Sequence, residues 1–302
     1  MSLKRKVVDL MPNPLVKIFA APYVSGDSEQ SAVTVADAMW RADKLMSTID
    51  LLGEEVTNDA EVEATISSYI KLIDLLGQQE HATVSLKPTQ LGSHKSVAAC
   101  QANIARIVEY AAAKQIPVTI DMEDHDYTDM TLAMYKALLP RFPTLGTVLQ
   151  TRLHRTEADI AGLKGLRTRV RLCIGIYLEP PEIALQRKPE MKTRMLAFTE
   201  RMLDDGHFVE FGTHDVALIH QCLNMAERRG FGPAQLEVQM LMGVPRTRIQ
   251  QELIAAGYNV RLYVPYAVMW KHATSYCKRR LAANPNMAFY VLGNLIRKIG
   301  QR

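Results

Sequence analysis

Three residues near the C-terminal end have types and a spacing that could bind an anion. Tyr276, Arg279 and Arg280 lie at positions i, i+3 and i+4 of a predicted helix over 270–283, so their side chains would share one face. Two adjacent guanidinium groups can hold a carboxylate through parallel hydrogen bonds, although a solvated basic face is the simpler alternative. Tyr263, near the end of the strand predicted over 259–266, favours a ligand site here.

Two further candidates lie where predicted strands end. Lys87 precedes Pro88, which favours an extended backbone and the end of a strand. Its amine could form a Schiff base, bind a substrate acid or simply lie at the surface. Asp121 opens the acidic run DMEDHD at 121–126, which could bind a divalent metal. The run leads into a predicted helix start, where acidic residues are favoured anyway, so we predict no metal site.

Arg171 is a third candidate, because it lies inside a strand rich in Val, Ile and Leu. Burying an arginine is costly unless it meets an anion or an electron-rich ring. Gly175, at the end of that strand, would let the backbone approach a ligand closely. The segment GTHD offers Thr213 and His214 to a sugar or phosphate, while a helix-capping role for Thr213 or Asp215 is the alternative.

The elements that must position these residues alternate regularly. Apolar segments of strand length recur, each followed by a helical pattern in which apolar residues are spaced three and four apart. Eight strands are predicted, within 44–56, 81–89, 116–124, 145–153, 169–177, 207–215, 234–243 and 259–266. Helices are predicted over 28–43, 96–115, 128–142, 215–230 and 270–283. Eight such units in one chain indicate a closed (βα)8 barrel of the TIM type.

We expect a single domain over 1–302, with an N-terminal helical extension over 1–43. The barrel itself is expected over 44–284, with the last helix covering its mouth. The reactive residues should gather at that mouth, where parallel strands end, and the strand ends also supply Asp50, Gln150 and Gln239. The chain contains neither the GxGxxG nor the GxxxxGK[ST] pattern, so nothing supports a Rossmann or P-loop nucleotide site.

Composition narrows the class of protein. The 302 residues are 48% hydrophobic and 23% charged, and the net charge is only +4, which does not favour a nucleic-acid partner. The four cysteines form no CxxC pair, which argues against a zinc site and a disulfide framework and favours a reducing cytosol. We predict neither a signal peptide nor a membrane-spanning helix, although the basic ends could contact anionic lipid peripherally.

From about Gly26 to Asn284, the sequence resembles the proline dehydrogenase family, the flavin-dependent βα-barrel enzymes that oxidise L-proline. The resemblance rests on nine segments in register: STIDLLGEEV, SLKPTQLG, TIDMED, VLQTRL, RLCIGIYLEPPEIALQ, FGTHD, EVQMLMGV, RLYVPY and YCKRRLAANP. It implies noncovalent FAD, hydride transfer to flavin N5, Δ1-pyrroline-5-carboxylate as product and a quinone as electron acceptor. It leaves open pyrroline-5-carboxylate dehydrogenase as a further partner. The implied location is the cytoplasm, with at most peripheral contact at the inner membrane.

The resemblance also implies roles for individual residues. Catalytic roles fall to Asp121, Arg171 and Lys87. Substrate-binding roles fall to Lys87, Tyr263, Tyr276, Arg279, Arg280 and Leu241. FAD-binding roles fall to Met122, Gln150, Arg171, Ile174, Gly175, Ile176, Thr213, His214 and Gln239.

Three positions depart from the family pattern. Ile174 stands where the family commonly has lysine, Ala283 where an acidic residue is common, and Asp215 where asparagine is usual. Two alternatives to this function stay open. One is a Schiff-base aldolase that uses Lys87, with the two arginines holding a substrate acid. The other is a barrel that binds proline or flavin without turnover.

Overall fold

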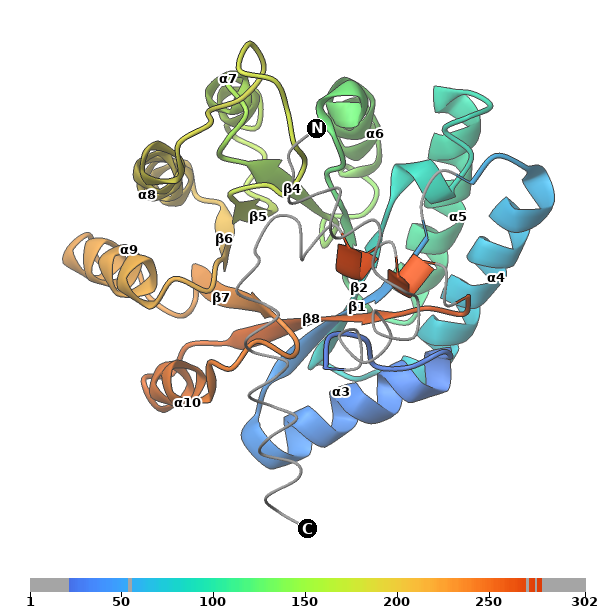
Figure 1. The fold of residues 1–302 in the computed structure, drawn as a ribbon, viewed down its shortest axis with the longest axis horizontal. Coiled ribbons are helices and arrows are strands. Elements are labelled where there is room, and N and C mark those ends of the chain that lie inside the picture. The colour runs from blue at the N-terminus through green and yellow to red at the C-terminus, as the bar shows by residue number, and fades with distance from the viewer. Residues whose placement is uncertain (1–21, 54–55, 270–271, 275, 279–302) are drawn as a thin grey trace.

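The chain forms a closed barrel of eight parallel strands, paired in sequence order from the first strand to the eighth and back to the first (Figure 1). This computed structural model describes residues 22–53, 56–269, 272–274 and 276–278. The strands are β1 Met46–Leu51, β2 Ala82–Leu86, β3 Val118–Ile120, β4 Gly146–Gln150, β5 Arg169–Cys173, β6 Phe208–Gly212, β7 Leu236–Leu241 and β8 Val260–Tyr266. All eight lie inside the predicted segments, so the prediction of a (βα)8 barrel is confirmed.

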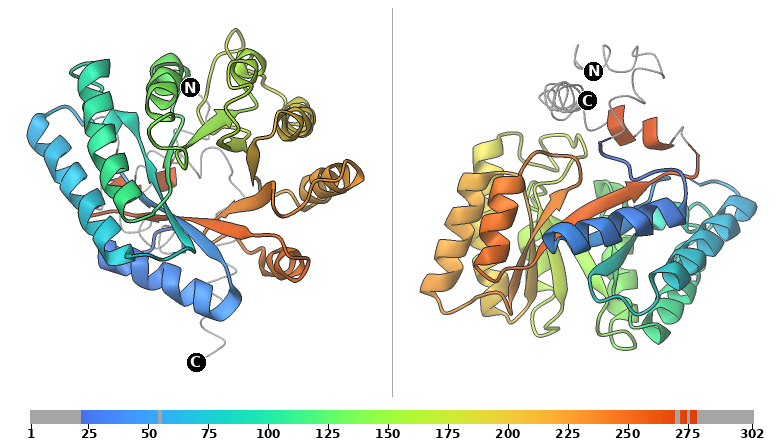
Figure 2. Two further views of the ribbon diagram at one scale, coloured as in Figure 1. Left: turned by 180° about the vertical axis from the view of Figure 1, so that it is seen from behind. Right: turned by 90° about the horizontal axis from the view of Figure 1, so that it is seen from below.

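Helices surround the strands on the outside of the barrel (Figures 1 and 2). They are α3 Glu29–Asp43, α4 Asp59–Leu76, α5 Val97–Ala113, α6 Thr128–Leu138, α7 Thr156–Ala161, α8 Lys188–Asp204, α9 Val216–Arg228 and α10 Thr247–Ala255. Short 3-10 helices, η1 Pro88–Gln90 and η2 His125–Tyr127, follow β2 and β3. Several helices begin at a polar side chain that accepts a hydrogen bond from the first turn, namely Ser28, Asn58, Ser96 and Asp215.

Helix α3 belongs to the outer layer of the barrel. It packs against β1, β8 and α4, and in Figure 1 it lies between α10 and α4. A barrel of this type needs a helix over the β8–β1 seam, because that part of the sheet is apolar on its outer face. Ala32, Val33 and Ala36 of α3 are buried there. The helix predicted as an N-terminal extension therefore completes the ring of helices.

The apolar core lies between the strands and the helices, whereas the inside of the barrel is strongly polar. Alternate residues of a strand face opposite sides of a sheet. On β6, Val209 and Phe211 are fully buried with the helices, while Glu210 between them contacts arginines of β5. The same alternation places a set of polar side chains inside, including Thr48, Asp50, Thr83, Ser85, Arg171, Glu237, Gln239 and Arg261.

The predicted last helix is only partly described. Residues 272–274 and 276–278 are helical, and Ala273, Tyr276 and Cys277 are buried. The rest of the predicted segment, with Arg279 and Arg280, lies outside the described residues, and so does Ala283.

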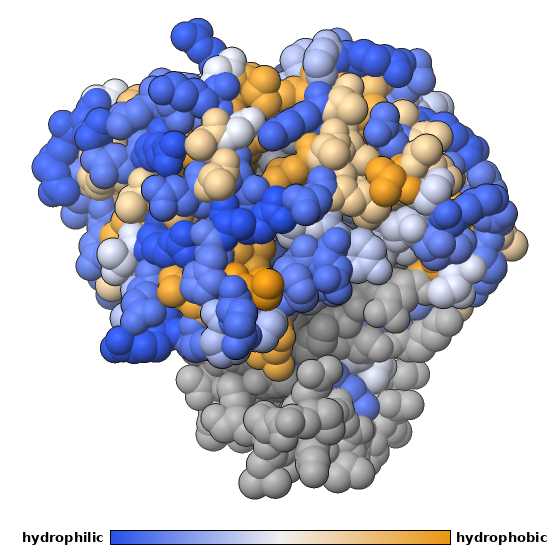
Figure 3. All heavy atoms as spheres, turned by 90° about the horizontal axis from the view of Figure 1, so that it is seen from above, coloured by the Kyte–Doolittle hydropathy of each residue, from blue (hydrophilic) through white to orange (hydrophobic). Residues whose placement is uncertain are grey.

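No helix in the described part of the chain combines the length and the apolar character needed to cross a bilayer. Among the atoms coloured in Figure 3, hydrophilic residues predominate, and hydrophobic residues gather mainly toward the middle and upper part of the face.

Candidate active site

Lys87 lies at the centre of a buried polar cluster at the carboxyl ends of the strands. It follows β2 directly, is 9% exposed, and its Nζ donates hydrogen bonds to Asp50 Oδ1, to Tyr263 OH at 3.2 Å and to Asp121 Oδ2 at 3.5 Å. The side chain is therefore not a surface residue. All three ammonium protons have an acceptor, so a substrate acid would have to take the place of one of them.

The two carboxylates beside Lys87 differ in how readily they ionise. Complete burial and the negative charge of Asp121 raise the pKa of Asp50 to about 6, although Lys87 opposes the shift. Burial alone would also raise the pKa of Asp121, but Lys87 and Arg171 outweigh it and lower that pKa. Asp121 is therefore the permanent anion of the cluster, and Asp50 is the carboxylate that can hold a proton.

Lys87 itself is held in its charged form. Burial would lower its pKa, but the attraction of Asp50 and Asp121 outweighs burial and raises the pKa above its ordinary value. A Schiff base requires a neutral amine with a free lone pair. This environment therefore suits Lys87 to binding an anion and disfavours the aldolase alternative.

Arg171 meets both partners that were expected to justify its burial. Its Nη1 donates to Asp121 Oδ1 at 2.7 Å, and its guanidinium carbon lies 5.3 Å from the ring centroid of Tyr263. Glu210 adds a second carboxylate, 3.7 Å from Nε. These anions outweigh the effect of burial and raise the pKa of Arg171. Arg171 lies in the middle of β5, as expected for a residue inside a strand. Tyr263 lies in the middle of β8, although a position near the strand end was predicted for it.

Gln239 fixes the direction of the Arg171 side chain. Its Oε1 accepts a hydrogen bond from Arg171 Nε at 2.6 Å, and its Nε2 donates to Glu237 Oε1 at 2.6 Å. Glu237 in turn accepts from Arg261 Nε at 2.7 Å. The predicted cofactor-binding residue Gln239 therefore positions Arg171, at the end of a chain of hydrogen bonds that runs through the barrel interior.

The segments expected to hold a flavin have features that fit such a ligand. Gln150, at the end of β4, donates to Glu123 O at 2.7 Å, while its Oε1 is buried and has no hydrogen-bond partner in the described part of the chain. A buried acceptor without a partner could accept a hydrogen bond from an N–H group of a ligand. Gly175 has φ of +99°, and a Cβ there would lie 2.3 Å from Gln150 Oε1. Ile174 and Ile176 flank Gly175 and are partly exposed, and Met122 is buried at the end of β3.

The segment after β6 is held in place by hydrogen bonds and by an ion pair. Thr213 donates its backbone N–H to Gln239 O at 3.0 Å, and His214 Nε2 accepts from Leu241 N at 3.2 Å. Asp215 is the N-cap of α9, where its side chain accepts from Leu218 N at 3.1 Å, and it also forms an ion pair with Lys192. Lys192 and the capped N–H groups lower the pKa of Asp215. The capping alternative is therefore confirmed for Asp215.

The acidic residues of the run 121–126 contact different parts of the structure. Asp121 belongs to the Lys87 cluster, and Glu123 accepts hydrogen bonds from Thr89 N at 2.9 Å and Thr89 Oγ1 at 2.6 Å. Within the described ranges, no group of three His, Cys, Asp or Glu side chains converges as metal ligands. His125 Nδ1 lies 2.6 Å from Glu179 Oε2, which ties the loop after β3 to the loop after β5.

The predicted substrate clamp is described only in part. Lys87 and Tyr263 are in contact, Tyr276 is buried, and Leu241 is partly exposed at the end of β7. Arg279 and Arg280 lie outside the described residues, so their approach to Lys87 stays a prediction.

Several residues of the site were not singled out from the sequence. Asp50 was noted only as a strand-end residue, although it is the nearest partner of Lys87. Ser85, Glu210, Glu237 and Arg261 complete the polar interior. Their signal was the alternation of charged and apolar residues, as in RVR at 169–171 and LEVQ at 236–239, which is unusual for strands that are buried on both faces.

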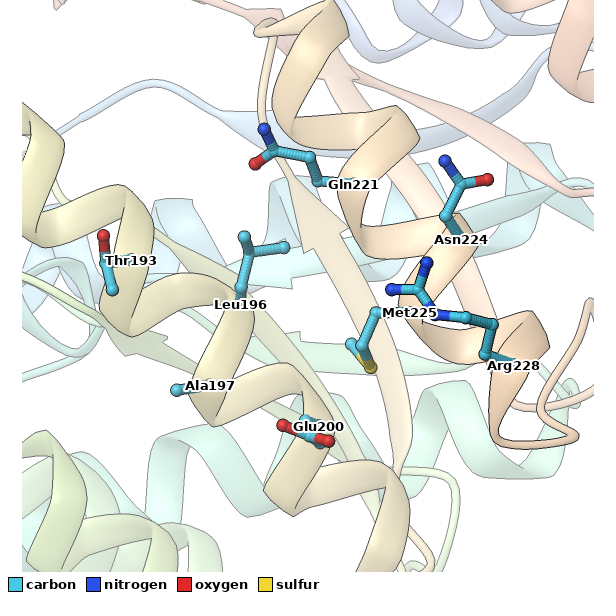
Figure 4. Close-up of a pocket in the computed structure, with 8 residues that line it drawn as sticks. All are labelled: Thr193, Leu196, Ala197, Glu200, Gln221, Asn224, Met225 and Arg228. Atoms are coloured by element: carbon cyan, nitrogen blue, oxygen red, sulfur yellow. The ribbon is translucent and has the colours of Figure 1, made fainter.

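A groove on the outside of the barrel is separate from this cluster. It lies between α8 and α9, has a volume of about 480 Å³ and is lined by Thr193, Leu196, Ala197, Glu200, Gln221, Asn224, Met225 and Arg228 (Figure 4). None of these residues was predicted to bind a ligand. The charged residues predicted to carry out chemistry lie at the barrel mouth, around Lys87.

The raised pKa of Asp50 predicts a specific pH dependence of stability. As the pH rises from about 4 to 6, Asp50 ionises in the unfolded chain before it ionises in the folded one, so the wild-type protein should lose stability over this range relative to Asp50→Asn. Urea unfolding at pH 4, 5, 6 and 7 measures the difference. Asp59→Asn is the control, since Lys95 lowers the pKa of this exposed carboxylate. A wild-type advantage over Asp50→Asn that stays constant or grows from pH 4 to 6 would contradict the assignment.

Comparisons with known proteins identify the family of this chain. The sequence model of the family described as Proline dehydrogenase matches residues 34–290. Proline dehydrogenase 1 of Bacillus subtilis is 31% identical over 283 residues, which cover 93% of this chain and 92% of that protein. Proline dehydrogenase of Deinococcus radiodurans is 33% identical over 287 residues, covering 91% of this chain and 90% of that protein.

A solved structure shows the same fold. Proline utilization A from Bdellovibrio bacteriovorus superposes with a TM-score of 0.80 at 23% identity, over 88% of this chain and 33% of that one. This chain therefore spans about a third of the length of that larger protein. The family match and the two relatives at more than 30% identity confirm the resemblance seen in the sequence. This chain belongs to the proline dehydrogenase family.

Proposed function

We propose that this protein oxidises L-proline to Δ1-pyrroline-5-carboxylate, with FAD as cofactor and a quinone as electron acceptor. The proposal is carried by one observation: a buried, permanently charged Lys87 at the mouth of a barrel that belongs to this family. When bound, FAD would supply the two-electron redox chemistry. The residues of the chain would bind and orient the substrate.

Lys87 would hold the carboxylate of proline. The substrate acid would replace one of the three acceptors of the ammonium group. Asp121 Oδ2 is the most distant of the three, at 3.5 Å. Asp121 would then keep Tyr263 in place, since Tyr263 OH donates to it at 2.6 Å. We assign the substrate acid to Lys87 together with Arg279 and Arg280, and the walls of the ring site to Tyr263, Tyr276 and Leu241.

Arg171 and Gln150 would face the flavin ring, Arg171 beside N5 and Gln150 through its unpartnered Oε1. Met122, Ile174, Gly175 and Ile176 would line the cofactor, with Thr213 and His214 toward its phosphate and adenosine part. Holding the proline ring in one orientation replaces most of the entropy that a collision in solution would cost. The cationic, water-poor surroundings would also lower the pKa of the substrate amine, which must be neutral to be oxidised.

The wider setting is part of the proposal. We expect one domain over 1–302, with the strands of the barrel within 44–284 and α3 as part of its outer layer. We expect it in the cytoplasm, with at most peripheral contact with the inner membrane, where a quinone would be reached. The product is chemically a substrate for pyrroline-5-carboxylate dehydrogenase, which is therefore a candidate partner.

An absorbance experiment tests the proposed reaction. Protein loaded with FAD and kept without oxygen should lose its oxidised flavin absorbance when L-proline is added. L-Prolinamide, which has the same ring without a charged acid, should act only at much higher concentration. An unchanged spectrum with L-proline, in protein shown to contain FAD, would remove the basis of the proposal.

A further inference from the structure

Arg152 is a buried cation in the loop between β4 and α7. It is 8% exposed, and its backbone N–H donates to Ile174 O at 3.2 Å. Its Nη1 donates to Tyr177 O. The side chain therefore lies along the segment that follows β5, from Ile174 to Tyr177. This loop contact differs from the Lys87 cluster, whose members come from the ends of β1, β2 and β3 and from the middle of β8.

In the part of the chain that the structure describes, no carboxylate lies within 4 Å of the Arg152 guanidinium. Four Lys or Arg side chains in the described ranges are 9% exposed or less, namely Lys87, Arg152, Arg171 and Arg261. Carboxylates lie within 4 Å of the other three. Arg152 has none at that distance, and its buried Nε has no hydrogen-bond partner in the same ranges.

A buried charge without a counter-charge is costly, so such a residue indicates that an anion is bound in the working state. The surroundings agree with this reasoning. Burial lowers the pKa of Arg152, and only the more distant attraction of Glu179 opposes the shift. A bound anion would remove this disadvantage.

The position of Arg152 indicates which anion would fit. Its Cδ lies 2.9 Å from the point that a Cβ of Gly175 would occupy, and Gln150 Oε1 lies 2.3 Å from the same point. Arg152 thus adjoins both the unpartnered acceptor and the glycine that were assigned to the flavin. FAD carries its negative charge on the diphosphate, and the planar guanidinium is well shaped to bind phosphate oxygens.

We propose that Arg152 binds the diphosphate of the flavin dinucleotide and is a cofactor-binding residue of this chain. The inference rests on the proposed use of FAD. It adds a specific prediction, because Arg152 should distinguish flavins with a diphosphate from flavins without one. The backbone carbonyl of Ile174 accepts a hydrogen bond from Arg152 N–H. A lysine in place of Ile174 would therefore bring a second cation close to the same anion.

The test compares the binding of FAD and riboflavin to flavin-free protein, followed by the quenching of flavin fluorescence. Arg152→Gln should weaken FAD binding by about tenfold to a hundredfold, the usual range for losing a hydrogen bond to a charged group, and should leave riboflavin binding unchanged. Arg152→Lys should retain part of the affinity. Adding Ile174→Lys to Arg152→Gln should restore part of it.

Arg187→Gln is the matched control, since it removes the same charge from the exposed end of the loop that follows β5. It should not change FAD binding. FAD affinity of Arg152→Gln within twofold of the wild type would overturn the inference. An equal loss of FAD and riboflavin would also overturn it, because the loss would then come from a disturbed loop.

A failure of the proposed function has a different signature. If the wild-type protein binds no flavin at all, the cofactor assignment is wrong, and inorganic pyrophosphate then decides the role of Arg152. Pyrophosphate that raises the melting temperature of the wild type but not of Arg152→Gln supports a diphosphate site at this residue. Equal responses of the two proteins overturn it.

Discussion

Replacing Asp121 with asparagine is expected to lower the free energy of unfolding by about 3 to 5 kcal/mol, the usual cost of removing one partner from a buried ion pair. Asp121 is 7% exposed and accepts hydrogen bonds from Arg171 Nη1 at 2.7 Å, Ser85 Oγ at 2.8 Å and Tyr263 OH at 2.6 Å. Asparagine has nearly the same shape but no charge. Arg171 and Lys87 would then stay buried with less negative charge around them.

Urea unfolding at pH 7 measures this loss, and Asp124→Asn is the matched control from the same acidic run. Burial and the negative charges of Glu179 and Asp126 raise the pKa of Asp124, so its charge does not favour the folded state and its removal should have little effect. The pKa of Asp121 is lowered, so its contribution is complete at neutral pH and disappears as the pH falls through the folded-state pKa. Equal effects of the two substitutions would contradict the central role of Asp121.

Replacing Lys87 with methionine is expected to lower kcat/KM for L-proline by about 30-fold to 5,000-fold. This range corresponds to about 2 to 5 kcal/mol, the cost of removing one partner from a buried, hydrogen-bonded charge pair. Methionine keeps much of the length of the side chain but cannot bind a carboxylate. The oxidation of L-prolinamide, which carries no acid, should change much less.

Two controls keep this result interpretable. Lys95→Met removes an exposed lysine that pairs with Asp59. It should leave kcat/KM for both substrates unchanged. Urea unfolding shows whether Lys87→Met is folded, and Asp50, which already holds a proton readily, can become neutral to compensate for the lost ammonium. If Lys87→Met lowered the rates with proline and prolinamide by the same factor, Lys87 would serve the structure and not the substrate acid.

The prediction of the fold depended on features that are local in the chain. Each strand segment is short, apolar and followed by a helix with its own spacing of apolar residues, and all eight were found. Such patterns arise because every strand must bury a face beneath its helix, whatever the rest of the chain does. The place of α3 was not predicted, because a helical pattern does not say which part of a sheet the helix will cover.

The site was predicted less completely, because local patterns do not say which residues from distant segments will meet. Lys87, Asp121, Arg171 and Tyr263 were selected singly, from strand ends and from the cost of burial, and the structure brings them into contact. The ion pair of Asp50 with Lys87 was not predicted, because it depends on the lateral register of β1 against β2, in which Asp50 is opposite Ser85. The role of Gln239 at the cofactor stays a prediction, and its hydrogen bond to Arg171 was not predicted.

The sequence by itself therefore determined the barrel, the family and the identity of most polar residues at its mouth, since periodicity and motifs are carried by neighbouring residues. Only the tertiary structure decided which charge meets which. It places carboxylates beside Lys87 and Arg171, whereas among the described residues none lies within 4 Å of Arg152. Ion pairing inside a barrel depends on the closure of eight strands at once, and no single segment of sequence contains that information.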